Sequence, residues 1–244
     1  MFESYFTRIA EILQQVRDTQ AEPIRLAAGK IADTIASKGT LYAFGCNHAN
    51  LLAKELVFRT GGLAVINLIE SPGLDLDVRP ITLTTDLERL DGLGAVLVRA
   101  AGLKSGDLLI VHSVSGRNSV AIDAARQARS LGASVICLTN LAYSKSVSSR
   151  HPSGLHLYEV ANIVLDNCGD IGDAVVELQG LGQKVGASST AVGAAILNAV
   201  VVEAVARLIE RGIEPPVFVS ANTEGGDAHN ARILAAYKDQ IKYL

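Results

Sequence analysis

The amino-acid sequence predicts an α/β protein, a three-layer sandwich in which helices flank a central five-stranded, mostly parallel sheet. Short β-rich runs ending in Gly, Ser or Asn alternate with longer helical stretches, a pattern typical of a parallel sheet buried on both faces. Of the 244 residues, 49% are apolar, which is enough for a large core. No repeat, low-complexity tract or Gly/Ser linker divides the chain, so residues 1–244 are predicted to form a single domain.

A helical pair is predicted at the amino terminus, in residues 1–38. Apolar residues from Phe2 to Val16 recur at three- and four-residue spacing, which predicts an amphipathic helix. A second helix is predicted from Pro23 to Ser37, because proline suits a first helical turn and Gly39 suits a helix end. The α/β core is predicted to follow in residues 39–211.

Five short apolar runs are the predicted strands. They are LYAFG (41–45), AVINLIE (64–70), DLLIVHS (107–113), SVICLTN (134–140) and NIVLDNCG (162–169). Right-handed crossovers between parallel strands require helices, which the sequence predicts at about 49–60, 93–101 and 118–131. Two stretches break this rhythm and are predicted to be surface loops with room for short helices, 70–92 and 143–159.

The last part of the chain is predicted to hold a buried helix and a helical tail. Residues 189–210 are rich in Ala, Val and Leu and are too apolar for a solvated surface helix. We expect this helix to pack against the sheet or a second subunit, which favours a homo-oligomer, a dimer or a tetramer. The tail, residues 212–244, is predicted to end in a helix from Ala228 to about Tyr243.

Composition excludes several classes of partner. Lysine and arginine number 22 against 25 acidic residues, so the net charge of -3 gives no field to attract nucleic acid. Three widely spaced cysteines without a CxxC indicate free thiols, which suit a reducing compartment. The amino terminus lacks the basic start and apolar run of a signal peptide, and the apolar runs contain Gly or polar residues. We therefore expect a cytoplasmic protein without a membrane partner.

The most informative segment is residues 106–138, in which a buried strand leads through HSVSGRNS into a helix. Ligands of open parallel sheets bind at the carboxyl ends of strands, and a helix amino terminus offers unpaired N–H groups to an anion. Ser113, Ser115 and Ser119 add hydroxyl donors, and Gly116 allows a tight turn. The segment predicts a phosphate site without lysine. Alternatively, it is a plain turn in which Asn118 or Ser119 caps the helix.

The run Ser-Val-Ser-Gly in this position resembles the phosphate loop of the sugar isomerase (SIS) domain family, whose pattern is Ser-x-Ser-Gly followed shortly by Ser or Thr. The resemblance implies a nucleotide-binding-like α/β sheet that binds a phosphosugar, with Ser113, Ser115 and Gly116 at the phosphate. The third hydroxyl position of the pattern falls on Asn118, and Ser119 follows it. Either residue is a candidate for this contact.

A second segment, LYAFGCNHANLLAKELVFR (41–59), resembles the first βα turn of phosphoheptose isomerases. The resemblance implies that Glu55 takes part in proton transfer, although the GCNHA loop is shorter and poorer in glycine than in those enzymes. The substrate-binding candidates in this loop are Cys46, Asn47 and His48. Alternatively, Glu55 is a surface carboxylate paired with Lys54 or Arg59, of which Arg59 has the favourable i+4 spacing.

A third segment, residues 184–204, resembles a Gly-x-x-Ser-Thr turn of glucosamine-6-phosphate synthase and N-acetylmuramic acid 6-phosphate etherases. The resemblance implies that Ser188, Ser189 and Thr190 lie beside the sugar. Ala191 stands where the synthase has a lysine, which argues against the same amino-sugar chemistry. A helix cap by Ser188 or Ser189 is the alternative, and both roles are compatible.

The carboxyl-terminal tail is similar to tails of functionally unassigned SIS proteins. Its Glu-Gly-Gly turn either folds over the site of a neighbouring subunit and presents Glu224 or His229 as catalytic groups, or serves only in packing. The chain has no dinucleotide fingerprint, P-loop or HExxH, so no cofactor and no metal are expected.

The predicted partner is a small phosphosugar, and three functions remain open for it. The first is aldose–ketose isomerisation, with the phosphate loop as anchor and Glu55 as base. The second is non-catalytic sensing of a phosphosugar, and the third is a lyase reaction of the etherase type.

Overall fold

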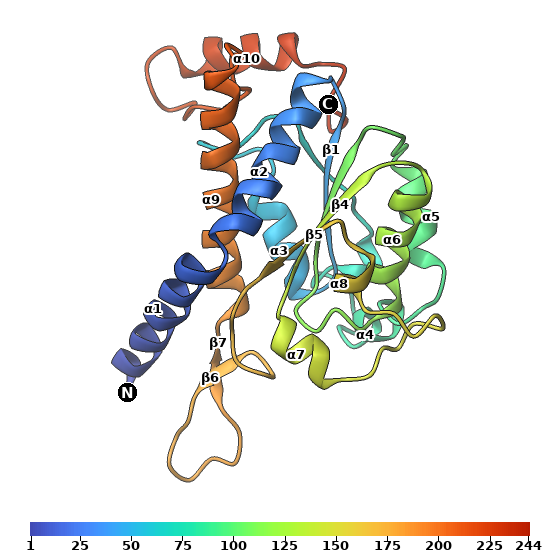
Figure 1. Ribbon diagram of the computed structural model, residues 1–244, viewed down its shortest axis with the longest axis vertical. Coiled ribbons are helices and arrows are strands. Elements are labelled where there is room, and N and C mark those ends of the chain that lie inside the picture. The colour runs from blue at the N-terminus through green and yellow to red at the C-terminus, as the bar shows by residue number, and fades with distance from the viewer.

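The computed structural model describes residues 1–244 and contains a five-stranded parallel sheet with the strand order β2-β1-β3-β4-β5 (Figure 1). The strands are β1 (Leu41–Gly45), β2 (Ile66–Leu68), β3 (Leu108–His112), β4 (Ser134–Thr139) and β5 (Ile163–Asp166). The predicted α/β class and the number of central strands are therefore confirmed. Each strand lies inside its predicted run, and only the ends differ.

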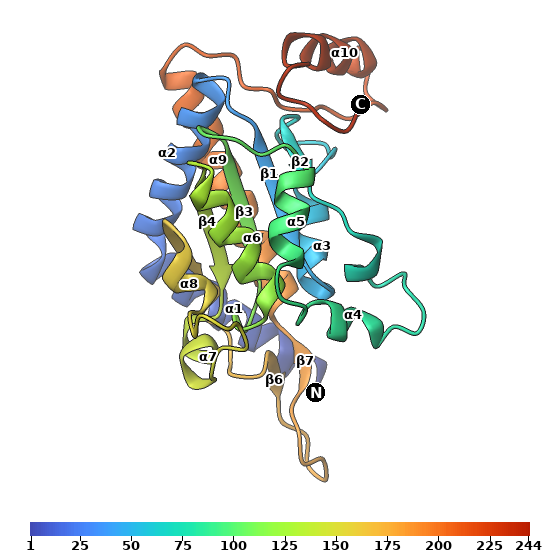
Figure 2. The same ribbon diagram turned by 90° about the vertical axis from the view of Figure 1, so that its right-hand side faces the viewer.

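Helices cover both faces of the sheet (Figure 2). One face packs against α2 (Ala21–Ala36), α3 (His48–Glu55) and α9 (Ser189–Glu210), and the other against α5 (Leu93–Ala100), α6 (Ser119–Ser130) and α8 (Leu157–Val160). Successive residues of a strand point to opposite faces. Accordingly, Leu41 and Ala43 enter the core under α2 and α9, whereas Tyr42 and Phe44 enter the core under α6. The amino-terminal α1 (Phe2–Thr19) extends beyond the sheet (Figure 1).

The apolar helix α9 covers the range that the sequence predicts, residues 189–210. By length and composition alone it would suffice to cross a membrane, and 44% of its apolar window is buried inside the chain, where it contacts α2 and α3. Its outer side keeps Val202 and Ile209 exposed by 70% and 61%. The helix is therefore a core element with an additional uncovered apolar side.

Several short elements have no individual signal in the sequence. A hairpin of β6 (Ala174–Val176) and β7 (Val185–Ala187) precedes α9 as a separate antiparallel sheet. Segment 70–92 contains η1 (Pro72–Leu74) and α4 (Leu83–Leu87). Segment 143–159 begins inside α7 (Leu141–Ser146). Leu74 and Thr84 are buried, so segment 70–92 packs against the core and is more than a surface loop.

The tail lies at the amino ends of the strands. Its helix α10 (Gly226–Ala236) is shorter than predicted, and the following residues bind the chain near β1 and β2. The Gln240 amide donates to the Gly39 carbonyl at 2.8 Å, and the Tyr243 hydroxyl donates to the Ala64 carbonyl at 2.7 Å. In Figure 1, α10 and the carboxyl terminus lie at the end of the sheet opposite α4 and α7.

Candidate functional site

A cavity of about 210 Å³ lies where the strand order reverses, at the carboxyl ends of β1 and β3. The chain leaves β1 toward β2 on one side and later leaves β3 toward β4 on the other, so the loops after these strands diverge. Such a switch point is the usual ligand crevice of an open α/β sheet. The lining residues are Cys46, Asn47, His48, Ala49, Glu88, His112, Ser113, Val114, Ser115, Asn118, Ala121, Tyr143 and Asp173.

The loop from Ser113 to Asn118 is held from behind through its carbonyl groups. Four successive carbonyls accept hydrogen bonds from the body of the protein: Val114 O from Asn140 N (3.0 Å) and Thr139 Oγ1 (3.0 Å), Ser115 O from Ser144 Oγ (2.8 Å), Gly116 O from Leu157 N (2.8 Å) and Arg117 O from Arg150 N (2.8 Å). These bonds fix the orientation of each peptide plane. The body of the protein therefore supports the loop in this backbone conformation without a ligand.

The amide groups of the same loop are free. The N–H groups of Val114, Ser115, Arg117 and Asn118 have no acceptor in the chain, and the first turn of α6 follows directly. The Ser115 hydroxyl also has no partner, and the Ser113 Oγ accepts only from Gly116 N at 3.3 Å. Free amides gathered at a helix amino terminus form a concave, electropositive site for an anion.

Gly116 is required by this loop for two reasons. Its φ of +59° lies in the left-handed region, and an added Cβ would stand 2.7 Å from Ser144 Oγ and 3.2 Å from Thr139 Oγ1. These two hydroxyls are among the groups that hold the loop. A side chain at this position would displace the support of the loop as well as strain its backbone.

Asn118 and Ser119 are both candidates for the third phosphate contact. Asn118 lines the cavity, and its Oδ1 accepts from Arg150 Nη1 at 2.9 Å. Ser119 is fully buried, and its hydroxyl is directed to the Arg150 carbonyl at 3.5 Å. Of the two side chains, the geometry therefore brings Asn118 to the cavity.

The loop after β1 forms the opposite wall. Cys46, Asn47 and His48 all line the cavity. Asn47 has a φ of +55°, and its Oδ1 accepts from Thr84 Oγ1 at 2.8 Å, which joins this loop to segment 70–92. Burial raises the pKa of the Cys46 thiol far above its usual value, so this thiol is uncharged at neutral pH.

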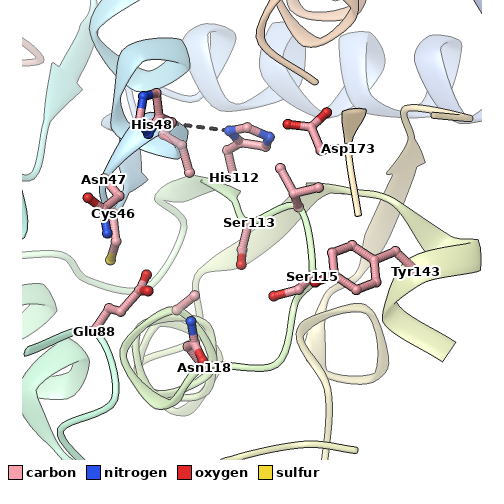
Figure 3. Close-up of a pocket in the computed structure, with 13 residues that line it drawn as sticks. Cys46, Asn47, His48, Glu88, His112, Ser113, Ser115, Asn118, Tyr143 and Asp173 are labelled. Atoms are coloured by element: carbon pink, nitrogen blue, oxygen red, sulfur yellow. Dashed lines mark hydrogen bonds between the residues drawn. The ribbon is translucent and has the colours of Figure 1, made fainter. Parts of the chain in front are cut away.

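His112 ends strand β3 as a neutral, oriented ring. Its Nδ1 donates to the Ala49 carbonyl at 3.1 Å, as the dashed line in Figure 3 shows. Burial lowers the pKa of His112 to about 4, and only its backbone hydrogen bond and Asp173 oppose that shift. Nε2 is buried without a partner. The imidazole therefore serves as an uncharged group at neutral pH.

Glu88 is a cavity residue that the sequence does not single out. Its side chain points toward the space between Cys46 and Ser113 (Figure 3). Burial raises the pKa of Glu88, and hydrogen bonds from Asn118 and Asn47 oppose this rise in part. Glu88 follows α4 in segment 70–92, which carries no motif, so only the folded chain reveals its position.

The three predicted catalytic residues lie outside this cavity within the single chain. Glu55, at the end of α3, pairs with Arg59 and faces Asn198 of α9 at 3.5 Å. Glu224 is exposed before α10, and His229 Nε2 donates to the Val217 carbonyl at 3.0 Å. Glu224 and His229 belong to the tail at the opposite end of the strands. Their predicted roles stay predictions that need a neighbouring subunit.

The start of α9 is already occupied by a carboxylate of the chain. Asp173 accepts from the amides of Ser188 and Ser189 at 3.1 and 2.7 Å and from the Ser189 hydroxyl at 2.7 Å. Neither serine lines the cavity, and neither does Thr190. Asp173 itself lines the cavity, so it links this helix terminus to the site. The sequence suggests a cap by the serines themselves, whereas the aspartate, which no motif marks, provides it.

The cavity contains no cationic side chain. No lysine or arginine is among its lining residues, and no group of three or more His, Cys, Asp or Glu side chains is arranged to hold a metal ion. An anion in the cavity would therefore be bound by amides, hydroxyls and the helix dipole alone.

Comparison with known proteins identifies relatives over the full length of the chain. The model of the SIS domain matches residues 4–140. A UPF0309 protein of Shouchella clausii is 47% identical over 242 residues, which cover 99% of this chain and 98% of the relative. A UPF0309 protein of Oceanobacillus iheyensis is 44% identical with the same coverage of both chains.

Solved structures share the fold at low sequence identity. Phosphoheptose isomerase GmhA from Neisseria gonorrhoeae has a TM-score of 0.54 and 18% identity, and the match covers 83% of this chain and 94% of that one. The Vibrio vulnificus NanR protein complexed with ManNAc-6P has a TM-score of 0.51 and 14% identity, with coverage of 96% and 68%. These likenesses support the fold alone.

Proposed function

Because the chain belongs to the SIS domain family, and within it to the UPF0309 proteins, we propose that it binds a phosphorylated sugar and interconverts its aldose and ketose forms. The observation that carries the proposal is the loop from Ser113 to Asn118. Its carbonyls accept hydrogen bonds from the rest of the chain, and four of its amides have no acceptor, at the switch point of the sheet.

A phosphate monoester suits this loop better than a carboxylate or a neutral ligand. Four free amides and two serine hydroxyls offer donors that surround a tetrahedral anion with several oxygens. The missing cations do not oppose the proposal, because amide donors and the dipole of α6 both favour negative charge. The rest of the cavity, between the loop and the β1 turn, is left for the carbon chain.

Isomerisation is the reaction that we propose for this site. Phosphoheptose isomerases are among the structures with the same fold. Proton transfer between adjacent carbons needs a base and a fixed substrate, and it needs no redox cofactor. The base that the resemblance implies is Glu55, which this chain pairs with Arg59.

Non-catalytic sensing is the second candidate. It is favoured by the position of Glu55 outside the cavity and by the NanR protein of the same fold, whose solved structure is a complex with ManNAc-6P. A sensor would bind the same ligands through the same loop. Only turnover separates the two functions.

We further propose that the protein acts in the cytoplasm as a homo-oligomer. The supporting observation is the exposed apolar surface of α1 and α9, where Phe2, Phe6, Val202 and Ile209 are each exposed by more than 60%. Exposed apolar area of this kind favours association. Size-exclusion chromatography with light scattering tests this part, and a monomer at micromolar concentration would contradict it.

The binding proposal is tested by thermal unfolding with sugar phosphates and with the same sugars lacking phosphate. A ligand that binds only the folded chain raises the melting temperature, by an amount that grows with concentration above Kd. We expect stabilisation by phosphorylated sugars only. The variant Ser115→Ala removes a cavity-lining hydroxyl without a partner in the chain, so it should weaken binding while leaving the unliganded melting temperature unchanged.

Ser130→Ala is the matched control, because Ser130 is exposed at the far end of α6 and its hydroxyl bonds locally to Gln127 O. The control should bind as the natural protein does. If no sugar phosphate stabilises the protein, or if Ser115→Ala binds as tightly as Ser130→Ala, the phosphate site is not in this loop.

A further inference from the structure

We propose that Glu88 is the acid–base residue of this site, the carboxylate that carries a proton between two adjacent carbons of the bound sugar. The inference rests on the proposed function and deepens it. It assigns the chemical step to segment 70–92, which no motif marks, instead of to the helix that follows β1.

The titratable side chains that line the cavity differ in how far the protein itself already uses them. Asp173 is already committed, because its carboxylate accepts four hydrogen bonds from Ser188 and Ser189 and its main-chain oxygen accepts two from Ser188. Asp173 therefore cannot exchange a proton with a ligand without losing these bonds. His112 donates its ring N–H to the Ala49 carbonyl. His112 Nε2 has no partner, but burial lowers the pKa of His112 to about 4, so the ring is a weak base at neutral pH.

Cys46 is the next group, and burial keeps its thiol protonated. His48 is exposed at the first turn of α3, and Tyr143 lies at the far side of the cavity, next to Ser115 (Figure 3). Glu88 is the other carboxylate that lines the cavity, and the side chains that bond to it are the neutral amides of Asn118 and Asn47, which leave acceptor sites on its two oxygens for a ligand. General acid–base catalysis at a carbon requires a group of this kind.

The position of Glu88 relative to the phosphate loop also supports this role. The side chains of Glu88, Ser113, Ser115 and Asn118 converge on the same space (Figure 3). A phosphate held by the loop would place the attached carbon chain within this space. The carboxylate therefore faces the part of the ligand at which isomerisation takes place.

The main chain around Glu88 is fixed to both walls of the cavity. The Glu88 carbonyl accepts from Val120 N, in the first turn of α6, at 3.2 Å. Thr84, one turn earlier, donates to Asn47 Oδ1 at 2.8 Å. The residue is thereby placed relative to both the phosphate loop and the β1 loop, as a catalytic group must be.

The proton transfer balances with the groups present. Starting from the open-chain aldose, a Glu88 oxygen takes the proton from C2, the C1–C2 double bond forms, and the C1 carbonyl oxygen takes the proton of the C2 hydroxyl. The resulting enediolate collapses when the protonated Glu88 returns its proton to C1 and the carbonyl forms at C2. The products are the ketose and an ionised Glu88, with C1 of the sugar reduced and C2 oxidised.

The electrostatic surroundings fit this role. Burial raises the pKa of Glu88, while Asn118, Arg89, Arg150 and Asn47 lower it. The Cys46 thiol also faces the carboxylate and is uncharged. A phosphate dianion in the loop would raise the pKa of Glu88 further, toward neutral pH, where a general base is most effective.

The test measures carbon-bound deuterium in sugar phosphates incubated with the protein in D2O, by NMR, alongside binding by thermal shift. When Glu88 has removed a C–H proton from the sugar, this proton can exchange with the solvent before it returns to carbon. The natural protein should therefore introduce deuterium at C1 or C2. Glu88→Gln should bind sugar phosphates and lose exchange about 10²- to 10⁴-fold, the usual contribution of a general base. Glu88→Asp, which keeps the carboxylate but shortens it, should retain part of the exchange.

The matched control is Asp86→Asn, a neutralised carboxylate two residues away that is exposed and outside the cavity. It should exchange at the natural rate. The variant Glu55→Gln tests the competing assignment. If Glu55→Gln loses exchange while Glu88→Gln keeps it, or if the natural protein binds sugar phosphates and exchanges none of their C–H protons, Glu88 is not the acid–base residue. Failure to bind any sugar phosphate would instead refute the proposed function.

Discussion

Substitution of Gly116 by alanine tests how the phosphate loop is built. The residue has a φ of +59°, and the new Cβ would stand 2.7 Å from Ser144 Oγ, which donates to Ser115 O at 2.8 Å. The methyl group cannot fit while Ser144 keeps this bond. Two effects therefore add, a backbone strain at residue 116 and the loss of a hydrogen bond that holds residue 115.

Their magnitudes follow from general values. A residue other than glycine in the left-handed region costs roughly 1–2 kcal/mol. A carbonyl that loses its partner costs about 1–3 kcal/mol if it stays buried. We expect Gly116→Ala to lower the free energy of unfolding by about 2–5 kcal/mol. Displacing one amide from a charged ligand removes about 1.5–3 kcal/mol of binding, which corresponds to a rise in Kd of about 10- to 100-fold.

The assays are denaturant unfolding and calorimetric titration with the sugar phosphate that stabilises the protein best. Gly102→Ala is the matched control, because Gly102 has a φ of +73° and open space where its Cβ would lie. This control should lose only the strain component of stability and none of the affinity. If Gly116→Ala binds as tightly as Gly102→Ala, the orientation of residues 115 and 116 does not determine phosphate binding, and the reasoning fails.

Three further predictions concern stability and assembly. Asp173→Ala leaves the amides at the start of α9 without their carboxylate, so thermal unfolding should show a loss of about 1–2 kcal/mol; an unchanged melting temperature would contradict the capping role. The folded-state pKa of His112, about 4, lies below its usual 6.5, so the unfolded chain binds more protons between these values, and stability should fall by roughly 3 kcal/mol as pH drops through that window. His112→Asn should flatten this part of the pH profile in urea titrations, and an unchanged slope would refute the assignment. Val202→Glu, on the exposed side of α9, should lower the mass measured by light scattering; an unchanged mass would exclude this surface from the subunit contact.

The central sheet is predictable from the sequence because its signals are local. Strand β3 alternates residues between two cores, and its run of apolar residues is long enough to be buried on both faces. Helix α9 has a composition that only burial explains, and its bounds agree with the prediction. In both cases the pattern that determines the element lies within the element itself.

The ends of elements are less predictable because distant segments determine them. Residues 64–70 are predicted as one strand, yet the ladder begins only at Ile66. Leu63 pairs with Val217, and Ala64 N donates to Pro216 O at 2.7 Å, so the tail covers the start of this apolar run. The sequence shows that these residues are buried but not which segment covers them.

The candidate site divides in the same way. The loop from Ser113 to Asn118 is recognisable because its donors, its glycine and its helix start are consecutive in the chain. Asp173 is not recognisable from the sequence, because its role depends on contacts with Ser188 and Ser189, which follow the β6–β7 hairpin. Glu88 is not recognisable either, because its position depends on two contacts between distant segments. Val120 N donates to the Glu88 carbonyl, and Thr84 Oγ1 donates to Asn47 Oδ1.

The sequence motif of the phosphate loop does not by itself identify the reaction. The phosphate loop and the proposed acid–base residue lie on separate segments, which meet where Val120 N of α6 donates to the Glu88 carbonyl. The free amides and the serine hydroxyls of the loop make no bond to the Glu88 side chain, so the residue at position 88 can change while these donors to the phosphate remain. We expect a chain that has the loop and lacks the carboxylate to bind phosphosugars without converting them. The motif therefore indicates the class of ligand, and the carboxylate that faces the loop indicates the reaction.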